Sequence, residues 1–342
     1  MVELKNECPV TVSPLSCSLN VEPRQVDTKG KPTKVELTWT GNGQKAELQT
    51  LVNGNPAPPL PKPQPQPPNS DALRDKKLPL DVTQTTEFVM TVTGSGGQKA
   101  TCHACVLNRP EAKNEKNPEV KILDIPPKFQ QKAMWCWLTV AQMIFQFQKP
   151  PVPKFNPWKV YSSKAPEPQG LDPDTVYQWG ILAAVHPECW LSPDSCALRG
   201  GGSSLNIQRM LREYPPKATE QKSLPLYSEN PKGCLDAKTI KDEIRAGRPI
   251  IAGISPGAGV PKPKPEHVAL IIGYQEDEKG NLKLIINDPW PFQLQKGGGD
   301  PYVKAGGTRN CEANYTIDLN DFCTKLGWSE SFIKIQPQKP AK

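Results

Sequence analysis

The chain has 342 residues, a formal net charge of +7, ten cysteines, eight tryptophans and forty prolines. This length is enough for two domains with separate hydrophobic cores. No run of 18 apolar residues is present, so the sequence predicts no membrane-spanning helix. The positive charge is spread over loops as lysines beside prolines, without a basic helix or an aromatic-basic surface, which argues against nucleic-acid binding.

Residues 1–107 read as an all-β domain, because apolar residues alternate along short segments separated by glycine-rich turns. The alternating segments lie at 17–21, 35–39, 88–92 and 102–106. Cys17, Trp39 and Cys102 follow the order of an immunoglobulin-type core, in which a tryptophan packs on a disulfide between two sheets. The pattern resembles bacterial Ig-like modules. We expect a Cys17–Cys102 disulfide, and strand parity turns Cys105 outward, with Cys8 as a possible partner.

Two segments near this domain carry unusual composition. Prolines at 56, 58, 59, 61, 63, 65, 67 and 68 make residues 55–69 a polyproline-type loop within the domain. Residues 108–124 form a charged linker.

Cys102 and Cys105 also form a Cys-x-x-Cys pair, but a zinc site needs four ligands and no second pair exists. The β-type surroundings argue against a redox motif. We therefore expect neither a metal nor a cofactor.

A second domain is predicted over residues 125–336, followed by a tail at 337–342. A core-facing helix begins near Cys136, because apolar residues recur at helical spacing after it. The stripe consists of Trp137, Val140, Ala141, Ile144 and Phe145. A cysteine at the first turn of a helix is favoured as the thiolate, which is the nucleophilic form.

Further helices and strands are expected along the rest of this domain. Helices are predicted at 173–185, after a cap at Ser203 or Ser204, and at 236–246, and a strand at 249–255. Cys189 and Cys196 have a spacing that suits a local disulfide. Of the three histidines, His186 reads as the end of a helix and His103 lies within the Cys-x-x-Cys pair.

The remaining histidine, His267, opens an apolar strand that runs to Tyr274, and a second strand at 281–287 ends at Asp288. In an antiparallel pair the start of one strand lies beside the end of the other. His267 and Asp288 would then be close enough for a base and the carboxylate that orients it. Asn287 is the alternative orienting residue. Cysteine, histidine and then Asp or Asn is the order of a papain-like catalytic constellation.

The chain resembles papain-like cysteine proteases over about residues 125–335, through three short motifs. Gln130 lies six residues before Cys136, the spacing of the oxyanion-hole glutamine in those enzymes. The Cys136-Trp137 pair, the histidine at the head of a strand and the Asp-Pro-Trp-Pro run at 288–291 resemble the bacterial effector and double-glycine-peptidase branch. Gln131, one residue out of register, is the alternative for the oxyanion role.

The resemblance implies an α+β papain-like fold after the Ig-like sandwich, and a separate catalytic role for each of four residues. Cys136 would attack the scissile carbonyl, His267 would take and return the proton, and Asp288 would orient the imidazole. The Gln130 side chain and the Cys136 backbone N–H would bind the oxyanion.

A cysteine protease acting on a protein or peptide substrate is therefore the predicted function. One alternative is another acyl transfer at the same site, such as deamidation or transglutamination. The other is a catalytically inactive protease fold that serves as a binding module. The Ig-like domain is expected to bind a protein partner or a delivery machinery.

The cysteine density and the Ig-like pattern favour secretion or delivery to another cell. Residues 1–10 contain Glu3, Lys5 and Glu7 and no apolar stretch, so they do not read as a signal peptide. A bacterial protease toxin or effector exported by another route fits this combination.

Overall fold

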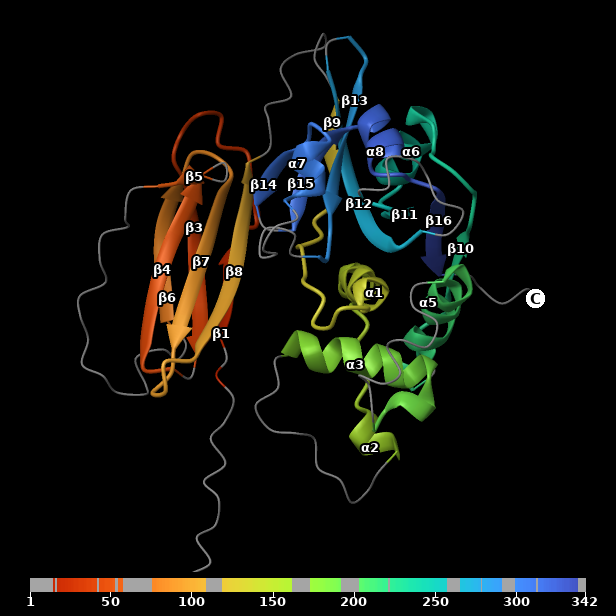
Figure 1. The fold of residues 1–342 in the computed structure, drawn as a ribbon, viewed down its shortest axis with the longest axis horizontal. Helices are drawn as coiled ribbons and strands as arrows, with labels where there is room; N and C mark the ends of the chain where they lie inside the picture. Colours follow the sequence, from red (N-terminus) through yellow and green to blue (C-terminus); the bar gives the residue numbers. More distant parts are fainter. Residues whose placement is uncertain are drawn as a thin grey trace, which may run out of the picture.

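Figure 1 shows a β-rich N-terminal domain beside a second domain of mixed helices and strands. The computed structural model describes residues 15, 17–41, 43–52, 55–57, 76–108, 119–161, 173–191, 203–220, 222–256, 265–277, 279–290, 299–311 and 313–337. Most of the predicted proline-rich loop, Cys8, Cys196, Pro291 and the tail beyond Pro337 lie outside these residues. No helix within the described ranges is long and apolar enough to cross a membrane.

Two sheets make up the N-terminal domain. One has the antiparallel order β1-β3-β6, and the other has the order β2-β8-β7-β4-β5, in which β2 and β8 are parallel. The strands are β1 (Cys17–Glu22), β2 (Gln25–Val26), β3 (Thr33–Gly41), β4 (Lys45–Val52), β5 (Asn55–Pro56), β6 (Lys76–Val82), β7 (Thr86–Thr93) and β8 (Lys99–Asn108).

A disulfide joins the two sheets of this domain, as the sequence predicts. Cys17 of β1 bonds to Cys102 of β8, with a Cα–Cα distance of 5.8 Å. Both cysteines and Trp39 pack on the buried side chains of Met90 and Val92. The expected disulfide is therefore confirmed, and Trp39 packs on the same buried side chains.

The second domain is built on one large antiparallel sheet of order β10-β16-β11-β12-β13-β15-β14, with β9 also paired to β12. Its strands are β9 (Val120–Ile122), β10 (Leu226–Glu229), β11 (Ile250–Ile254), β12 (His267–Glu276), β13 (Leu282–Asn287), β14 (Thr308–Cys311), β15 (Asn314–Asp318) and β16 (Glu330–Pro337). Its helices are α1 (Cys136–Phe147), α2 (Pro157–Tyr161), α3 (Pro173–Val185), the 3₁₀ turn η2 (Pro187–Cys189), α5 (Ser204–Ala218), α6 (Ala237–Arg245), α7 (Pro301–Lys304) and α8 (Leu319–Lys325).

Helices cover the centre of this sheet. Every residue of β11 is buried, and so is the run Val268–Tyr274 of β12. Since successive residues of a strand point to opposite faces, both faces must be covered. Helix α1 packs on β12, α3 and α5 pack on α1, and α6 packs on β11 and β12. The predicted helices and strands of this domain are thus confirmed, with Ser203 as the cap of α5 and Asp236 as the cap of α6.

Strand pairing reaches into both ends of the segment 108–124, which was predicted to be a linker. Asn108 still belongs to β8, and β9 pairs with β12 through Ile122 opposite Gly273. A Cβ atom on Gly273 would lie 2.6 Å from the carbonyl oxygen of Lys121, so only glycine lets β9 approach this closely. Because charged residues interrupt such a short strand, it has no apolar pattern from which its pairing could be predicted.

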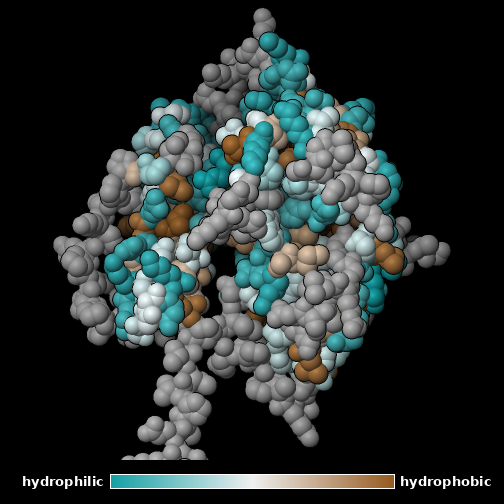
Figure 2. All heavy atoms as spheres, in the orientation of Figure 1, coloured by the Kyte–Doolittle hydropathy of each residue, from teal (hydrophilic) through white to brown (hydrophobic). Residues whose placement is uncertain are grey.

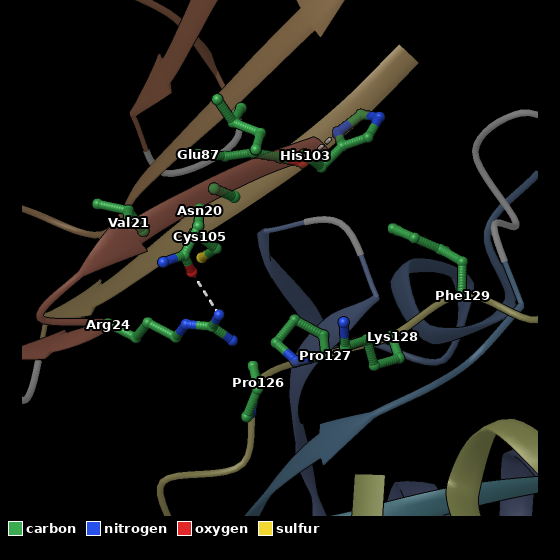
Figure 3. Close-up of a pocket in the computed structure, with 12 residues that line it drawn as sticks. Asn20, Val21, Arg24, Glu87, His103, Cys105, Pro126, Pro127, Lys128 and Phe129 are labelled. Carbon is green, nitrogen blue, oxygen red and sulfur yellow. Dashed lines mark hydrogen bonds and ion pairs between the residues drawn. The ribbon is translucent and has the colours of Figure 1, made fainter. Parts of the chain in front are cut away.

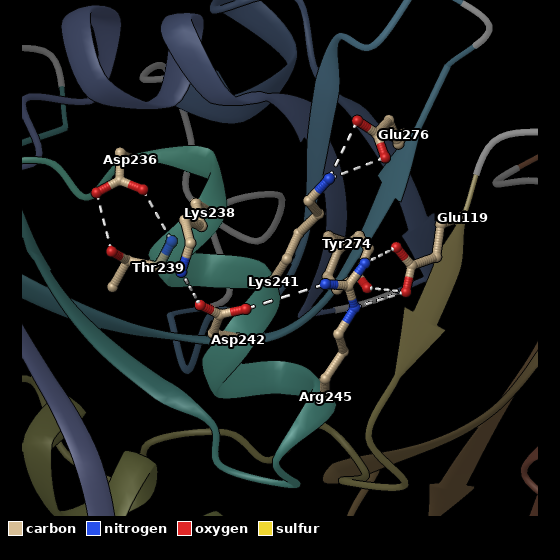
Figure 4. A network of polar contacts seen from close by, with 9 residues as sticks. All are labelled: Glu119, Asp236, Lys238, Thr239, Lys241, Asp242, Arg245, Tyr274 and Glu276. Carbon is tan, nitrogen blue, oxygen red and sulfur yellow. Dashed lines mark hydrogen bonds and ion pairs between the residues drawn. The ribbon is translucent and has the colours of Figure 1, made fainter.

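Side chains of α6 and β12 anchor the residue before β9 (Figure 4). The Glu119 carboxylate accepts hydrogen bonds from both Nε and Nη2 of Arg245 and, at 2.5 Å, from the Tyr274 hydroxyl. The Arg245 guanidinium and the Tyr274 hydroxyl together lower the pKa of Glu119 to about 2. The carboxylate therefore stays ionised and tied to this domain across the physiological pH range.

Covalent and polar contacts connect the two domains. Cys105 of β8 bonds to Cys311 of β14, with a Cα–Cα distance of 6.3 Å, so the suggested Cys105–Cys8 pairing is wrong. The prediction that Cys105 faces outward from the N-terminal domain is correct, but the second domain covers that face. The Gln25 amide also donates to the Leu123 carbonyl at 3.1 Å. The bonds of Cys102 and Cys105 to different partners leave no Cys-x-x-Cys pair to bind a metal. On the face seen in Figure 2, a hollow marks the boundary between the domains.

Candidate active site

Cys136 is the first residue of α1 and the free cysteine of the described chain. It is 8% exposed, and ten consecutive residues from it to Phe145 are buried. The helix can be apolar on nearly all sides because the sheet covers one side and α3 and α5 cover others. A thiol in the middle of such a helix would be inaccessible, whereas the first turn places it at the edge of the core. Its backbone N–H also has no partner within the helix at this position.

His267 lies between Cys136 and Asp288. It is the first residue of β12, and the antiparallel pairing of β12 with β13 brings it beside the residue that follows β13. Its Nε2 atom lies 2.7 Å from Oδ1 of Asp288. Cys136 interacts with the imidazole as well, and because Nε2 faces Asp288, Nδ1 is the ring nitrogen available to the thiol. The His267 side chain is 12% exposed and that of Asp288 is fully buried.

The two neighbours of His267 determine its protonation. Desolvation lowers the pKa of the imidazole, but the charge and hydrogen bond of Asp288 and the contact with Cys136 outweigh it and raise the pKa of His267 to about 10. Asp288 and Cys136 therefore favour the protonated form of the imidazole. An imidazolium beside a thiol and a buried carboxylate is the environment in which a cysteine acts as a nucleophile.

Asp288 rather than Asn287 contacts the histidine. Asn287 points the other way into the core, where its amide donates to the Ile125 carbonyl at 2.9 Å and accepts from Asn314 at 2.7 Å. Asp288 immediately follows the strand, so its side chain lies on the opposite face. Its Oδ1 atom also accepts the backbone N–H of Trp290 at 2.8 Å.

A buried tyrosine that the sequence did not single out completes the surroundings of Asp288. The Tyr302 hydroxyl donates to Oδ2 of Asp288 at 2.7 Å, and no part of Tyr302 is exposed. Tyr302 lies on the short helix α7, and Asp300 caps this helix. The Asp-Pro pair at 300–301 is a helix-start signal, but nothing in the sequence indicates that this helix faces Asp288.

Gln130 is close to this cluster but is not aimed as an oxyanion donor. Its backbone N–H donates to the carbonyl of Pro289, the neighbour of Asp288, at 2.9 Å. Its side-chain Nε2 donates to the carbonyls of Lys132 and Ala133, both at 2.9 Å, which occupies both amide hydrogens. A hydrogen bond to a substrate oxygen would require the amide to turn.

The alternative residue, Gln131, is engaged with α3. Its Oε1 atom accepts from the Thr175 hydroxyl at 3.0 Å, and its backbone N–H donates to Oε1 of Gln178. The Gln178 amide nitrogen also donates to the Phe129 carbonyl at 2.9 Å. Gln178 therefore binds the residues on both sides of Gln130 and fixes the segment that carries it.

The N-terminal domain contacts this same segment. The ring of His103 packs edge-on against Phe129, at 5.8 Å between ring centroids, and its Nδ1 atom lies 3.2 Å from Oε1 of the buried Glu87. A cavity of about 80 Å³ lies between the domains here, and Arg24 and Lys128 also line it (Figure 3). No pattern in the sequence indicates that the first domain lies next to the Gln130 segment.

No curated protein sequence matches this chain. Two structures of the ragweed pollen cysteine protease Amb a 11 in its proform are similar to it, at 15% and 13% identity. The matches cover 66% and 65% of this chain and 67% of the pollen protease, with a TM-score of 0.32 in both cases.

The model of the Peptidase_C39 like family matches residues 122–315, which is more than half of the chain. The match begins within β9 and ends within β15, and so includes Cys136, His267 and Asp288. It supports a cysteine-protease-like function, and the chain belongs to the Peptidase_C39 like family.

Proposed function

We propose that the protein is a cysteine peptidase that cleaves peptide bonds through Cys136, His267 and Asp288. The observation that carries the proposal is the continuous contact from the thiol through the imidazole to a buried carboxylate. Family membership supports the same reaction class. A lone buried cysteine would be expected to be inert, but a cysteine at a helix start in contact with an imidazolium is not.

In the proposed reaction the Cys136 sulfur attacks the substrate carbonyl carbon, and the carbonyl oxygen becomes an oxyanion. The backbone N–H of Cys136 stabilises the oxyanion, since it has no partner within the helix. The His267 imidazolium then gives its proton to the departing amine, which leaves a thioester on Cys136. Water, deprotonated by the neutral imidazole, releases the second product and restores the thiol.

Gln130 is proposed as the second oxyanion donor, and this role requires a movement. Its amide hydrogens donate to the carbonyls of Lys132 and Ala133, so the amide must exchange one of these bonds for a bond to the substrate oxygen. The short backbone segment is held in place by Pro289 and Gln178 during this exchange. Gln131 is unsuited to the role because its side chain is bonded to α3.

For the N-terminal domain we propose an Ig-like sandwich that positions the enzyme on a protein partner or delivery surface. The two sheets, the Cys17–Cys102 disulfide and the packing of Trp39 on the same buried side chains support this assignment. Export from the cytosol is part of the proposal. The three disulfides between described residues, of which one joins the domains, are expected of a protein that works in an oxidising compartment.

The proposal is tested by incubating a cellular protein extract with the full chain and, in parallel, with Cys136→Ala, and sequencing the peptides by mass spectrometry. New peptide termini should appear only with the unchanged protein. A mass change of about one dalton at glutamine, or a crosslink, would instead show acyl transfer to water or an amine at a side chain. Identical peptides in both samples would favour a binding module.

A further inference from the structure

We propose that Tyr302 is a positioning residue for the triad, which holds the Asp288 carboxylate in the orientation that His267 requires. This inference rests on the proposed function. The two carboxylate oxygens of Asp288 are held by different elements. Oδ1 accepts from His267 and from the Trp290 backbone, and Oδ2 accepts from Tyr302 alone among its described partners.

A carboxylate held only through Oδ1 could turn about its terminal bond, because that torsion is soft. The Tyr302 hydroxyl bonds the other oxygen at 2.7 Å and prevents this rotation. Burial and the charge of Asp288 raise the pKa of Tyr302 well above its usual value, so the hydroxyl remains a neutral donor. The bond is charge-assisted and lies in a buried site, where such bonds are strong.

The Tyr302 ring is itself fixed, so its hydroxyl position does not depend on Asp288. The ring stacks on Tyr315 of β15 at 4.1 Å and an interplanar angle of 11°. Tyr315 pairs with Ile286 of β13, two residues before Asp288. The backbone N–H of Tyr302 also donates to the Asp300 side chain at 2.9 Å. The strand that leads to Asp288 and the strand that supports Tyr302 are thus neighbours in one sheet.

Loss of the hydroxyl should alter the titration of His267 as well as the rate. The titratable groups around the imidazole are Cys136 from α1 and Asp288 after β13, with Tyr302, Asp300 and Tyr315 next to or behind the carboxylate. Without the Tyr302 donor, the negative charge on Asp288 is less compensated and attracts the imidazolium more strongly. A more tightly held proton is given up less readily to the leaving amine.

The test compares Tyr302→Phe with Tyr315→Phe in the full chain. Both variants remove one buried hydroxyl from the same stacked pair, but the Tyr315 hydroxyl is not among the described donors to Asp288. The chain has only three histidines, so the His267 signal can be followed by nuclear magnetic resonance after isotope labelling, with His267→Gln for assignment. Steady-state rates are measured on a peptide that the unchanged protein cleaves.

Tyr302→Phe should shift the His267 titration to higher pH by about half a unit or more and lower kcat by about tenfold, with KM changed by less than about twofold. Tyr315→Phe should change neither quantity. If Tyr302→Phe leaves the titration and kcat unchanged, or if both variants behave alike, the positioning role is refuted. If Cys136→Ala cleaves as well as the unchanged protein, the proposed function fails, and the His267 titration still decides whether Tyr302 controls the orientation of Asp288.

Discussion

Replacement of Asp288 by asparagine should remove the charge that keeps His267 protonated while leaving the geometry almost unchanged. The asparagine oxygen can take the place of Oδ1 and accept from Trp290, because a backbone N–H offers only a donor. Its NH₂ group then faces the Tyr302 hydroxyl, which can turn and accept a hydrogen bond. The variant therefore tests the charge and not the shape of the site.

The size of the effect of Asp288→Asn follows from the pKa of the His267 imidazole. In the folded protein the pKa of His267 is raised from 6.5 to about 10, with Asp288 as the largest of the raising influences. Each pKa unit corresponds to about 1.4 kcal/mol. If Asp288 supplies half or more of the increase, Asp288→Asn should remove at least about 2–3 kcal/mol of imidazolium stabilisation. The pKa of His267 should then fall by about two units or more.

Nuclear magnetic resonance titration of labelled histidine measures this directly, and peptide cleavage at pH 7 should fall by about 10²–10⁴ in kcat. Asn287→Asp provides a control for the neighbouring position, although its burial in the core will lower stability. The reasoning is refuted if the His267 titration in Asp288→Asn stays within about half a unit of that of the unchanged protein.

Three further predictions concern the oxyanion site, pH and the first domain. Gln130→Ala should lower turnover by about 10²–10³, and Gln131→Ala by much less, in steady-state assays; a larger loss from Gln131→Ala would reverse the assignment. The pKa of His267 is raised in the folded protein, so its contribution to stability is complete below pH 6.5 and is lost as the pH rises towards about 10. The free energy of unfolding, measured with urea, should therefore fall over this pH range, and His267→Gln should lack this fall. A chain that starts at Asn117 and carries Cys311→Ser should cleave a small peptide but lose partner binding; a folded, inactive truncate would show that the first domain supports the site.

Local sequence patterns were sufficient for the elements that carry the site. The helical apolar stripe after Cys136, the apolar strand that starts at His267 and the apolar strand that leads to Asp288 predicted the positions of these residues, because a period of 3.6 or 2 residues reports directly on burial. The alternation around Cys17 and Cys102 predicted a disulfide that the structure contains.

Contacts between distant segments could not be predicted in this way. Tyr302 lies 14 residues after Asp288 on a four-residue helix, and only the pairing of β13 with β15 brings them together. The Cys105–Cys311 disulfide joins residues 206 positions apart in sequence. The alternation of side chains along the strand indicates the face on which Cys105 lies, but not the cysteine to which it bonds. The orientation of the Gln130 amide depends on the carbonyls of a tight turn, which spacing does not reveal.

The central claim is that Cys136 is a nucleophile activated by His267. The most direct measurement is the rate at which iodoacetamide alkylates each thiol of the native full-length protein at pH 7, mapped by mass spectrometry. Cys136 should react faster than any other thiol despite being 8% exposed, and His267→Gln should slow it by at least about tenfold. If Cys136 is among the slowest thiols and is unaffected by His267→Gln, the account is contradicted.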